Sequence, residues 1–257
     1  MKDLQTLISI DDYDVPEFAD LAAAFGTARY GFVVTPNVDH LIRYYEEQEF
    51  RAIYAAADYV LLDSRFLSHV LRVSRGIRIR VCPGSDLTDQ LFRHVIQKRD
   101  KVIVIGGRPW QVEWLTRQYG LENIEHFNPP MGFTRDYGAL EACLDFVEAH
   151  SPFRFCFLAV GCPQQELVAE RLKARGRATG LALCVGASID FVTGAQRRAP
   201  RWMQHLGMEW LFRALQNPTR LGRRYFLRGP YIFPLLQRYT FWLRRAPVVG
   251  ADSLDSP

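Results

Sequence analysis

The chain has 257 residues, of which 48% are hydrophobic and 23% are charged. This length and composition are ordinary for a folded domain with one large core, and they exclude extensive disorder except at the tail, residues 248–257. The net charge is +4, but residues 196–245 contain eleven arginines, no lysine and one acid, and the rest carries 21 basic and 27 acidic residues. A basic end on an acidic body indicates an anionic partner: nucleic acid, an anionic membrane or a nucleotide diphosphate.

Apolar, β-branched runs alternate with helical stretches along most of the chain. The expected strands are residues 4–10, 32–34, 57–63, 77–82, 101–105, 124–127, 153–160 and 181–185. The expected helices are residues 16–25, 39–57, 64–75, 87–98, 110–119, 137–150 and 164–175. Strands and helices that alternate at this spacing predict an α/β fold, with a Rossmann-like, mostly parallel sheet and helices on both faces.

The alternation ends near Gly194, and the sequence beyond it is rich in arginine and aromatic residues and is interrupted by prolines. We therefore predict a Rossmann-like core (1–195), a helical, membrane-associating appendage (196–247) and a disordered tail (248–257). The longest charge-free run of the appendage is far shorter than the ~20 residues that span a bilayer. Residues 225–245 suit a helix in the membrane interface, and they equally suit a helical hairpin packed on the core.

The start of the chain, MKDLQTLISIDDYD, has acids where a signal peptide needs an apolar core, so we expect no export signal. The five cysteines are scattered and form no C-x-x-C pair, which is typical of a reduced, cytosolic protein. The six histidines show no metal-binding spacing, and Asp11 and Asp12 lie in an early loop. We therefore expect no metal site.

Two expected strands end abruptly on polar residues. Thr35 and Asn37 follow the first of them, and Asp63 follows the second. Because ligands of open α/β sheets bind at the carboxyl ends of the strands, a hydroxyl, an amide and a carboxylate would face one crevice. Asp63 suits a general base but equally a helix N-cap. Asn37 suits sugar or ribose binding, and a plain Asx turn explains it almost as well.

Three glycine-containing turns each lie between an expected strand and an expected helix. The first contains Gly84 and Ser85, the second contains Gly107, and the third directly precedes Gln165. Glycine there lets the backbone approach a phosphate, although none of the turns matches G-x-G-x-x-G or the Walker motif. Gln165 can bind a sugar hydroxyl or cap its own helix.

Without a metal, arginine would have to meet the charge of a departing diphosphate. Each candidate can equally be a solvated surface charge, and the candidates are Arg80, Arg213, Arg220 and Arg223.

Seven motifs occur in one order along the chain: TPNVDH, ADYVLLD, RVCPGSDL, VIGGRP, VGCPQQE, VGASIDFVTGAQRRAP and LGMEWLFRALQNPTRLGRRY. Together they resemble the WecG/TagA/CpsF glycosyltransferases, glycosyltransferase family 26, over about residues 31–225. The chain departs from the family pattern at Ser64, where the family often has glycine, and in the extra Cys82 and Pro83 before Gly84.

The resemblance implies an inverting transferase that moves a hexose derivative from a UDP-sugar to a polyprenyl-diphosphate-linked saccharide in bacterial cell-surface or exopolysaccharide biosynthesis. Glucuronic acid, N-acetylmannosamine, its uronic acid and glucose all remain open as the donor sugar. The resemblance implies no metal or other cofactor. It implies a peripheral enzyme on the cytoplasmic face of the membrane. The expected partner surface is an anionic membrane and not nucleic acid, and a homo-oligomer formed through the core remains open.

Carried over by position, the family pattern makes Asp63 the catalytic base. Thr35, Asn37 and Gln165 would contact the donor or the acceptor. Arg80 and three appendage residues, Arg213, Arg220 and Arg223, would face the diphosphate.

Two rival functions remain to be compared. A nucleotide-dependent oxidoreductase needs a glycine fingerprint after the first strand, where this chain has TPN instead. The alternative to a transferase is an arginine-rich module that binds nucleic acid or membrane on a nucleotide-binding fold. Tight, salt-sensitive oligonucleotide binding would indicate the nucleic-acid form of it.

Overall fold

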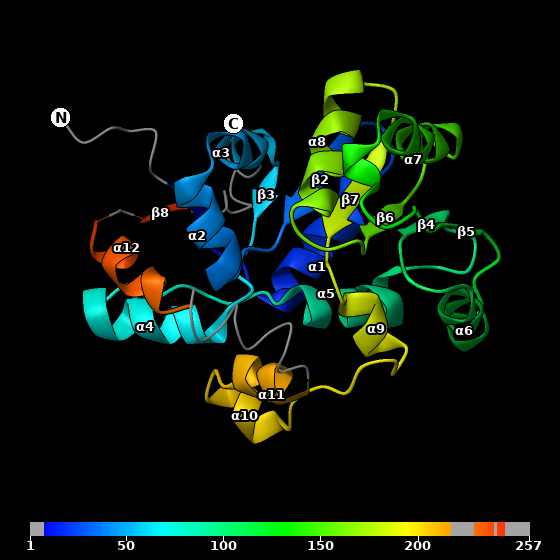
Figure 1. Cartoon of the computed structure of the whole chain (residues 1–257). Helices are drawn as coiled ribbons and strands as arrows, with labels where there is room; N and C mark the ends of the chain where they lie inside the picture. Colours follow the sequence, from blue (N-terminus) through cyan, green and yellow to red (C-terminus); the bar gives the residue numbers. More distant parts are fainter. Residues whose placement is uncertain (1–7, 217–228, 239–240, 245–257) are drawn as a thin grey trace, which may run out of the picture.

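The computed structural model describes residues 8–216, 229–238 and 241–244. Its main sheet has six strands in the order β3-β2-β7-β6-β4-β5, and every pair of neighbours is parallel. A second sheet pairs β1 with β8, also in parallel. Helices lie on both sides of the main sheet (Figure 1). The predicted α/β fold with a parallel sheet between two helical layers is confirmed.

The strands are β1 (Ile8–Asp11), β2 (Tyr30–Val34), β3 (Tyr59–Val60), β4 (Val102–Ile105), β5 (Ile124–Phe127), β6 (Phe155–Leu158), β7 (Gly180–Cys184) and β8 (Phe241–Arg244). The helices are α1 (Val15–Phe25), α2 (Val38–Glu46), α3 (Gln48–Ala56), α4 (Arg65–Arg75), α5 (Gly84–Gln90), α6 (Pro109–Tyr119), α7 (Tyr137–Ala149), α8 (Gln164–Arg175), α9 (Ser188–Val192), α10 (Arg201–His205), α11 (Glu209–Gln216) and α12 (Ile232–Arg238). A π-helical turn (Leu91–Val95) and two 3₁₀ turns (Phe133–Arg135 and Gly229–Tyr231) complete the described elements.

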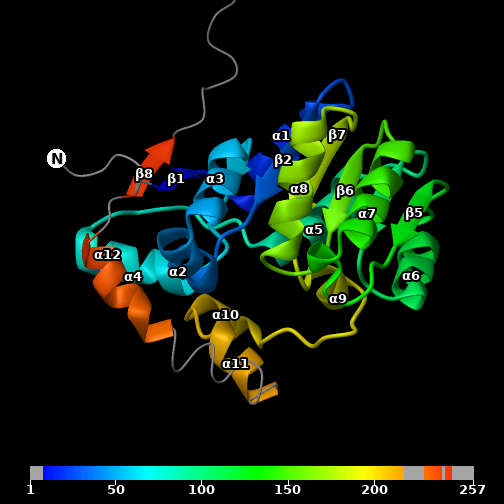
Figure 2. The ribbon, with the colours of Figure 1, turned by 45° about the horizontal axis from the view of Figure 1, so that its top comes forward.

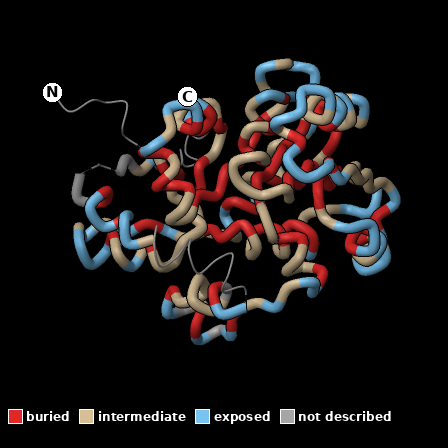
Figure 3. The backbone as a smooth tube through the Cα atoms, in the orientation of Figure 1, coloured by how far each residue is buried: buried red, intermediate tan, exposed pale blue. Residues whose placement is uncertain are grey.

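Successive residues of the central strands point to opposite faces of the sheet and build two apolar cores. On β2, Phe32 and Val34 belong to the core under α2, α3, α7 and α8, whereas Val33 belongs to the core under α1, α5 and α6. The buried residues are concentrated in the strands and on the inner faces of these helices (Figure 3). Because both faces are covered, the central strands are continuously apolar, which is the pattern that the sequence shows.

Two expected strands are shorter than the sequence indicates. The run 57–63 pairs with β2 as a strand only over Tyr59–Val60. Residues 77–82 form no strand, although the backbone N–H of Cys82 donates to the carbonyl of Leu62 at 2.9 Å. Pro83 follows directly and has no N–H, so this hydrogen-bond ladder cannot continue.

The described part of the predicted appendage is mostly helical, as expected, but residues 241–244 form strand β8, which the sequence did not predict. Strand β8 lies beside β1, and α12 lies beside α4 (Figure 2). The side chains of Ile232, Leu235 and Leu236 are buried in the core under α2, so the packed alternative describes α12 well. None of the described helices combines the length and apolar character that crossing a bilayer requires.

Several predictions fall outside the described residues. They concern the tail over residues 248–257, the first part of strand 4–10, and the positions of Arg220 and Arg223. Arg213 lies on α11, but its side chain is also outside the described part of the structure.

Gly180, the first residue of β7, has a φ of +125°, and a Cβ atom there would overlap the carbonyl oxygen and ring of Phe153. Gly176 also has a positive φ, +66°, but has open space around it. We expect Gly180→Ala to lower the free energy of unfolding by about 3 kcal/mol or more, since strain and overpacking add, and Gly176→Ala to lower it by about 1–2 kcal/mol. Urea unfolding of both variants measures this difference, and equal losses would contradict it.

Candidate active site

A cavity of about 830 Å³ lies at the carboxyl ends of the central strands. This volume is in the range of pockets that bind small molecules and cofactors. The turns after β2, β3, β6 and β7 line it, together with parts of α4, α5 and the C-terminal helices. Five of the predicted site residues are among the lining residues, and these are Thr35, Asn37, Asp63, Ser85 and Gln165.

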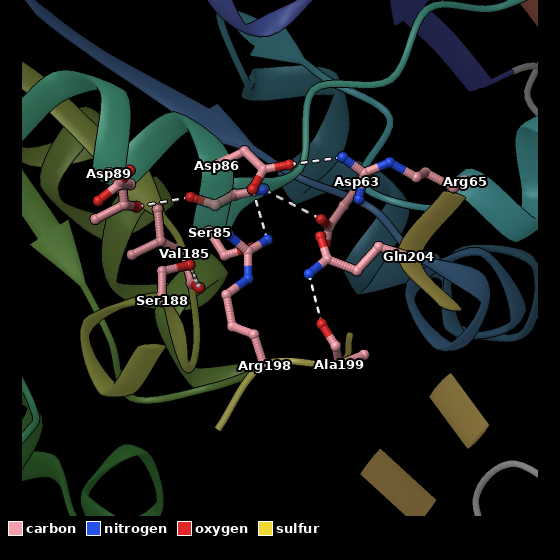
Figure 4. Close-up of polar contacts among 12 residues, drawn as sticks. Asp63, Arg65, Ser85, Asp86, Asp89, Val185, Ser188, Arg198, Ala199 and Gln204 are labelled. Atoms are coloured by element: carbon pink, nitrogen blue, oxygen red, sulfur yellow. Dashed lines mark hydrogen bonds and ion pairs between the residues drawn. The ribbon is translucent and has the colours of Figure 1, made fainter. Parts of the chain in front are cut away.

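Asp63 is held beside the turn that follows β2, because its backbone N–H donates to the carbonyl of Pro36 at 3.0 Å. Its side chain is half-buried and lines the cavity. Oδ1 accepts a hydrogen bond from the backbone N–H of Gly84 at 3.1 Å, which orients the carboxylate (Figure 4). The N-cap of α4 is Ser64, whose Oγ accepts from the N–H of Leu67 at 3.1 Å. The interpretation of Asp63 as an N-cap is therefore wrong.

Thr35 and Asn37 have structural roles as well as positions in the cavity wall. The Thr35 hydroxyl donates to the carbonyl of Cys184 at 3.0 Å, so only its oxygen lone pairs remain for a ligand. Asn37 caps α2, with Oδ1 accepting from the N–H of Asp39 at 3.1 Å, so the Asx-turn interpretation of Asn37 is confirmed. Gly84 lies behind this wall, where a Cβ atom would approach the Thr35 hydroxyl to 3.1 Å.

Ser85 is part of a charged cluster at one side of the cavity. Asp86 lies between two arginines: Arg65 donates to Oδ2 at 2.8 Å, and Arg198 donates to Oδ1 at 2.5 Å (Figure 4). Arg198 also donates to the Ser85 hydroxyl at 3.0 Å. Two guanidinium groups share one carboxylate, so the cluster keeps a positive charge next to the cavity.

The structure does not bring Arg80 or Gly107 to the cavity. Arg80 pairs with Asp12 and Glu17, at the start of α1. Gly107 forms the left-handed turn between β4 and α6, and the next residue, Arg108, lines the cavity instead. Among the described residues, no acid forms an ion pair with Arg108. Gly107 of the VIGGRP turn was a predicted site residue, whereas Arg108 of the same turn was not.

The C-terminal helices close one side of the cavity. Trp210 of α11 and Phe233 of α12 each pack edge-on against Phe66 of α4, with ring centroids 6.3 and 6.5 Å apart. All three aromatic residues line the cavity, together with Gln204 of α10. The arginines that the sequence predicted from the appendage have side chains outside the described part of the structure, and its described part contributes Arg198 beside the cavity together with this aromatic wall.

His40, which lines the cavity, forms a cluster with Cys162 and Glu166, and the potential ligand atoms of these three residues all lie within 4.8 Å of one another. His40 and Glu166 are buried, with Nε2 and Oε1 3.3 Å apart. Burial alone would lower the pKa of His40, but Cys162 and Glu166 outweigh it and raise this pKa to about 10. Burial raises the pKa of the Cys162 thiol, and His40 partly offsets that shift.

Nitrogen, sulfur and oxygen donors suit zinc, so within the described part of the chain this cluster is the place that could hold a metal ion. No sequence pattern predicted this cluster, because His40 and the Cys162–Glu166 segment are far apart in the chain and have no recognisable spacing.

The sequence model of the family described as "Glycosyl transferase WecG/TagA/CpsF family" matches residues 5–246. The match includes the whole main sheet, every cavity-lining turn and the C-terminal helices. It agrees with the motifs TPNVDH, ADYVLLD and VGCPQQE, whose residues the structure places around one cavity. The chain therefore belongs to the WecG/TagA/CpsF family of glycosyltransferases.

Proposed function

We propose that this chain transfers a hexose derivative from a UDP-sugar to a polyprenyl-diphosphate-linked saccharide, with inversion at the anomeric carbon. Membership of the family makes it a glycosyltransferase of cell-surface polymer synthesis. The finer proposal is supported by one observation above all. A single cavity combines the Asp63 carboxylate, the polar groups of Thr35, Asn37 and Gln165, and arginines at its side.

The proposed reaction is a single displacement. An acceptor hydroxyl oxygen bonds to the anomeric carbon, the bond from that carbon to the UDP oxygen breaks, and Asp63 takes the hydroxyl proton. The Gly84 N–H holds Oδ1 in place, which directs the carboxylate before the acceptor arrives. One base is sufficient here, unlike the paired carboxylates of most glycosidases.

The departing UDP carries the largest charge in this reaction, and guanidinium groups are suited to bind its phosphates. Arg108 and Arg65 line the cavity, and we assign them to this role, with Arg213, Arg220 and Arg223 contributed by the appendage. In this proposal a divalent cation is not required. Arg80 has a structural role, because two acids already pair with it.

We further propose that residues 196–247 bring the cavity to the cytoplasmic face of the membrane, where the acceptor lipid lies. Exposed apolar side chains support this location, since Trp202, Leu206, Leu215 and Tyr231 are each at least half exposed on the C-terminal helices and turn. The arginines of the same segment would attract anionic head groups. Arg-mediated binding of nucleic acid is the alternative.

Asp63→Asn should lower kcat by about 10²–10⁴-fold, because general-base catalysis contributes about that much. Asp89→Asn is the matched control, since Asp89 lies on α5 and pairs with Arg93 outside the cavity lining. Transfer to a synthetic polyprenyl-diphosphate sugar, assayed with a chelator present, measures both variants. Full activity of Asp63→Asn would remove the base from the mechanism, and loss of wild-type turnover in the chelator would show that a metal is needed.

Arg108→Ala should weaken UDP binding by about tenfold, because it removes a charge-assisted contact worth about 1.5–3 kcal/mol. Arg80→Ala removes the same charge outside the cavity and should change UDP affinity by less than about twofold. Calorimetric titration of both variants with UDP tests this assignment. A larger effect of Arg80→Ala than of Arg108→Ala would return the phosphate-binding role to Arg80.

The full chain should float with lipid vesicles, and the bound fraction should rise with the content of anionic lipid. Leu206→Asp should reduce this binding, because it places a charge on the exposed apolar surface of the C-terminal helices. Met131→Asp is the control. Met131 is fully exposed in the turn that follows β5, and β5 is the edge strand on the opposite side of the sheet from β3. Tight, salt-sensitive oligonucleotide binding without vesicle binding would support the nucleic-acid alternative.

A further inference from the structure

Four polar contacts form a continuous chain beside the cavity and connect the turns that follow β2, β6 and β7. The backbone N–H of Asn37 faces Nδ1 of His40 at 3.4 Å, and Nε2 of His40 faces Oε1 of Glu166 at 3.3 Å. The same Oε1 accepts from Nε2 of Gln165 at 2.7 Å. Finally, Oε1 of Gln165 accepts from the backbone N–H of Gly186 at 2.8 Å.

These contacts use most of the hydrogen-bonding capacity of the Gln165 amide. Its oxygen is engaged by Gly186, and one of its two N–H groups is engaged by Glu166. The second N–H of the amide remains to donate to a ligand in the cavity, and the oxygen, which already accepts from Gly186, has one further lone pair. An amide turned by 180° would instead present its oxygen and would recognise a donor. The orientation of this amide therefore decides which kind of ligand atom the cavity accepts.

We propose that His40 and Glu166 are positioning residues, which hold the Gln165 amide in this orientation, so that the cavity selects a hydrogen-bond acceptor at this point. A sugar hydroxyl or carbonyl oxygen, or a phosphate oxygen, fits that requirement. This inference rests on the proposed transfer from a UDP-sugar and adds how one wall of the cavity recognises that substrate. Glu166 is not among the cavity-lining residues, so it acts through Gln165.

Burial explains why the orientation is well defined. Glu166 is 0% exposed, His40 is 6% exposed and Gln165 is 3% exposed. A buried carboxylate without a partner is strongly unfavourable, and the hydrogen bond that Glu166 receives comes from Nε2 of Gln165. Nε2 of His40 lies 3.3 Å from the same oxygen without a hydrogen bond, and Oε2 of Glu166 has no hydrogen-bond partner among the described residues. Turning the amide over would put its oxygen against the carboxylate and its N–H₂ against the Gly186 N–H. Both contacts of the turned amide would be repulsive.

The same side chains could be ligands of zinc, and the hydrogen bond from Asn37 argues against that role. An N–H that donates to Nδ1 needs a lone pair there, so this contact belongs to the neutral imidazole with its proton on Nε2, 3.3 Å from Oε1 of Glu166. The imidazolium that Cys162 and Glu166 favour also carries a proton on Nε2. A nitrogen bound to zinc carries no proton, and its partner nitrogen usually donates. The two arrangements thus differ in whether Nε2 is protonated.

A double-mutant cycle tests the positioning role. We expect Glu166→Met to lower kcat/KM by about tenfold and Gln165→Met to lower it at least as much. The double variant should have a kcat/KM no lower than that of Gln165→Met, because both substitutions remove the same interaction. Glu166→Gln keeps an oxygen at the position of Oε1 and should recover most of the activity. Losses that multiply in the double variant, or no recovery in Glu166→Gln, would overturn the proposal.

Tyr30→Phe is the matched structural control. It removes the hydrogen bond from the Tyr30 hydroxyl to the carbonyl of Ala169 at 3.0 Å, which also joins β2 to α8 but lies outside the cavity lining. Its kcat/KM should stay within about twofold of wild type. A tenfold loss in this variant would show that any loosening of β2 from α8 reduces activity, and would overturn a specific role for Glu166.

A second measurement needs neither activity nor a folded Glu166 variant. Two-bond ¹⁵N–¹H spectra of the wild-type protein, with His40 assigned through His40→Gln, should show a proton on Nε2. An unprotonated Nε2, with or without stoichiometric zinc in elemental analysis, overturns the proposal. A wild-type protein that transfers no sugar would refute the proposed function, while these spectra would still decide whether His40 and Glu166 are paired.

Discussion

The parallel pairing of β2 with both β3 and β7 is the constraint on which the active-site cavity depends. Val34 pairs with Val60 on one side and with Cys184 on the other, so the three strands reach their carboxyl ends at nearly the same level. The residues that follow leave the sheet together. Thr35 then meets the Cys184 carbonyl, and the Asp63 backbone meets the turn after β2. A shift of β3 by one residue would turn Asp63 to the other face of the sheet.

The C-terminal segment lines the cavity together with the strand ends of the sheet. It anchors itself through apolar side chains of α12, which join the same core as Phe32 and Val34, and through β8, which pairs with β1. Asp11 strengthens this attachment, because its carboxylate accepts from the N–H of Val60 at 2.8 Å and pairs with Arg244 at 3.0 Å. The two ends of the described chain are thus tied to the strand that precedes Asp63.

The arginines around the cavity differ in how completely acidic side chains neutralise them. This difference separates arginines with a structural role from arginines that can bind a ligand. Arg80 is matched by two acids, whereas Arg65 and Arg198 share Asp86. Arg108 has no acidic partner among the described residues. An anionic ligand gains most from a cation that has not already been neutralised, which is why the proposal assigns phosphate binding to Arg108 and Arg65 and excludes Arg80.

Local sequence patterns were enough to predict the sheet, most of its helices, and the polar residues at strand ends. Alternation of apolar runs with helical stretches depends on neighbours in the chain, and Thr35, Asn37, Asp63 and Gln165 were found because they follow such runs directly. Only the tertiary structure decided the contacts between segments that are distant in the sequence. Arg80 faces α1, Arg108 faces the cavity, and β8 pairs with a strand at the other end of the chain. The pairing of His40 with Glu166 likewise requires α2 and α8 to meet, and no local pattern contains that information.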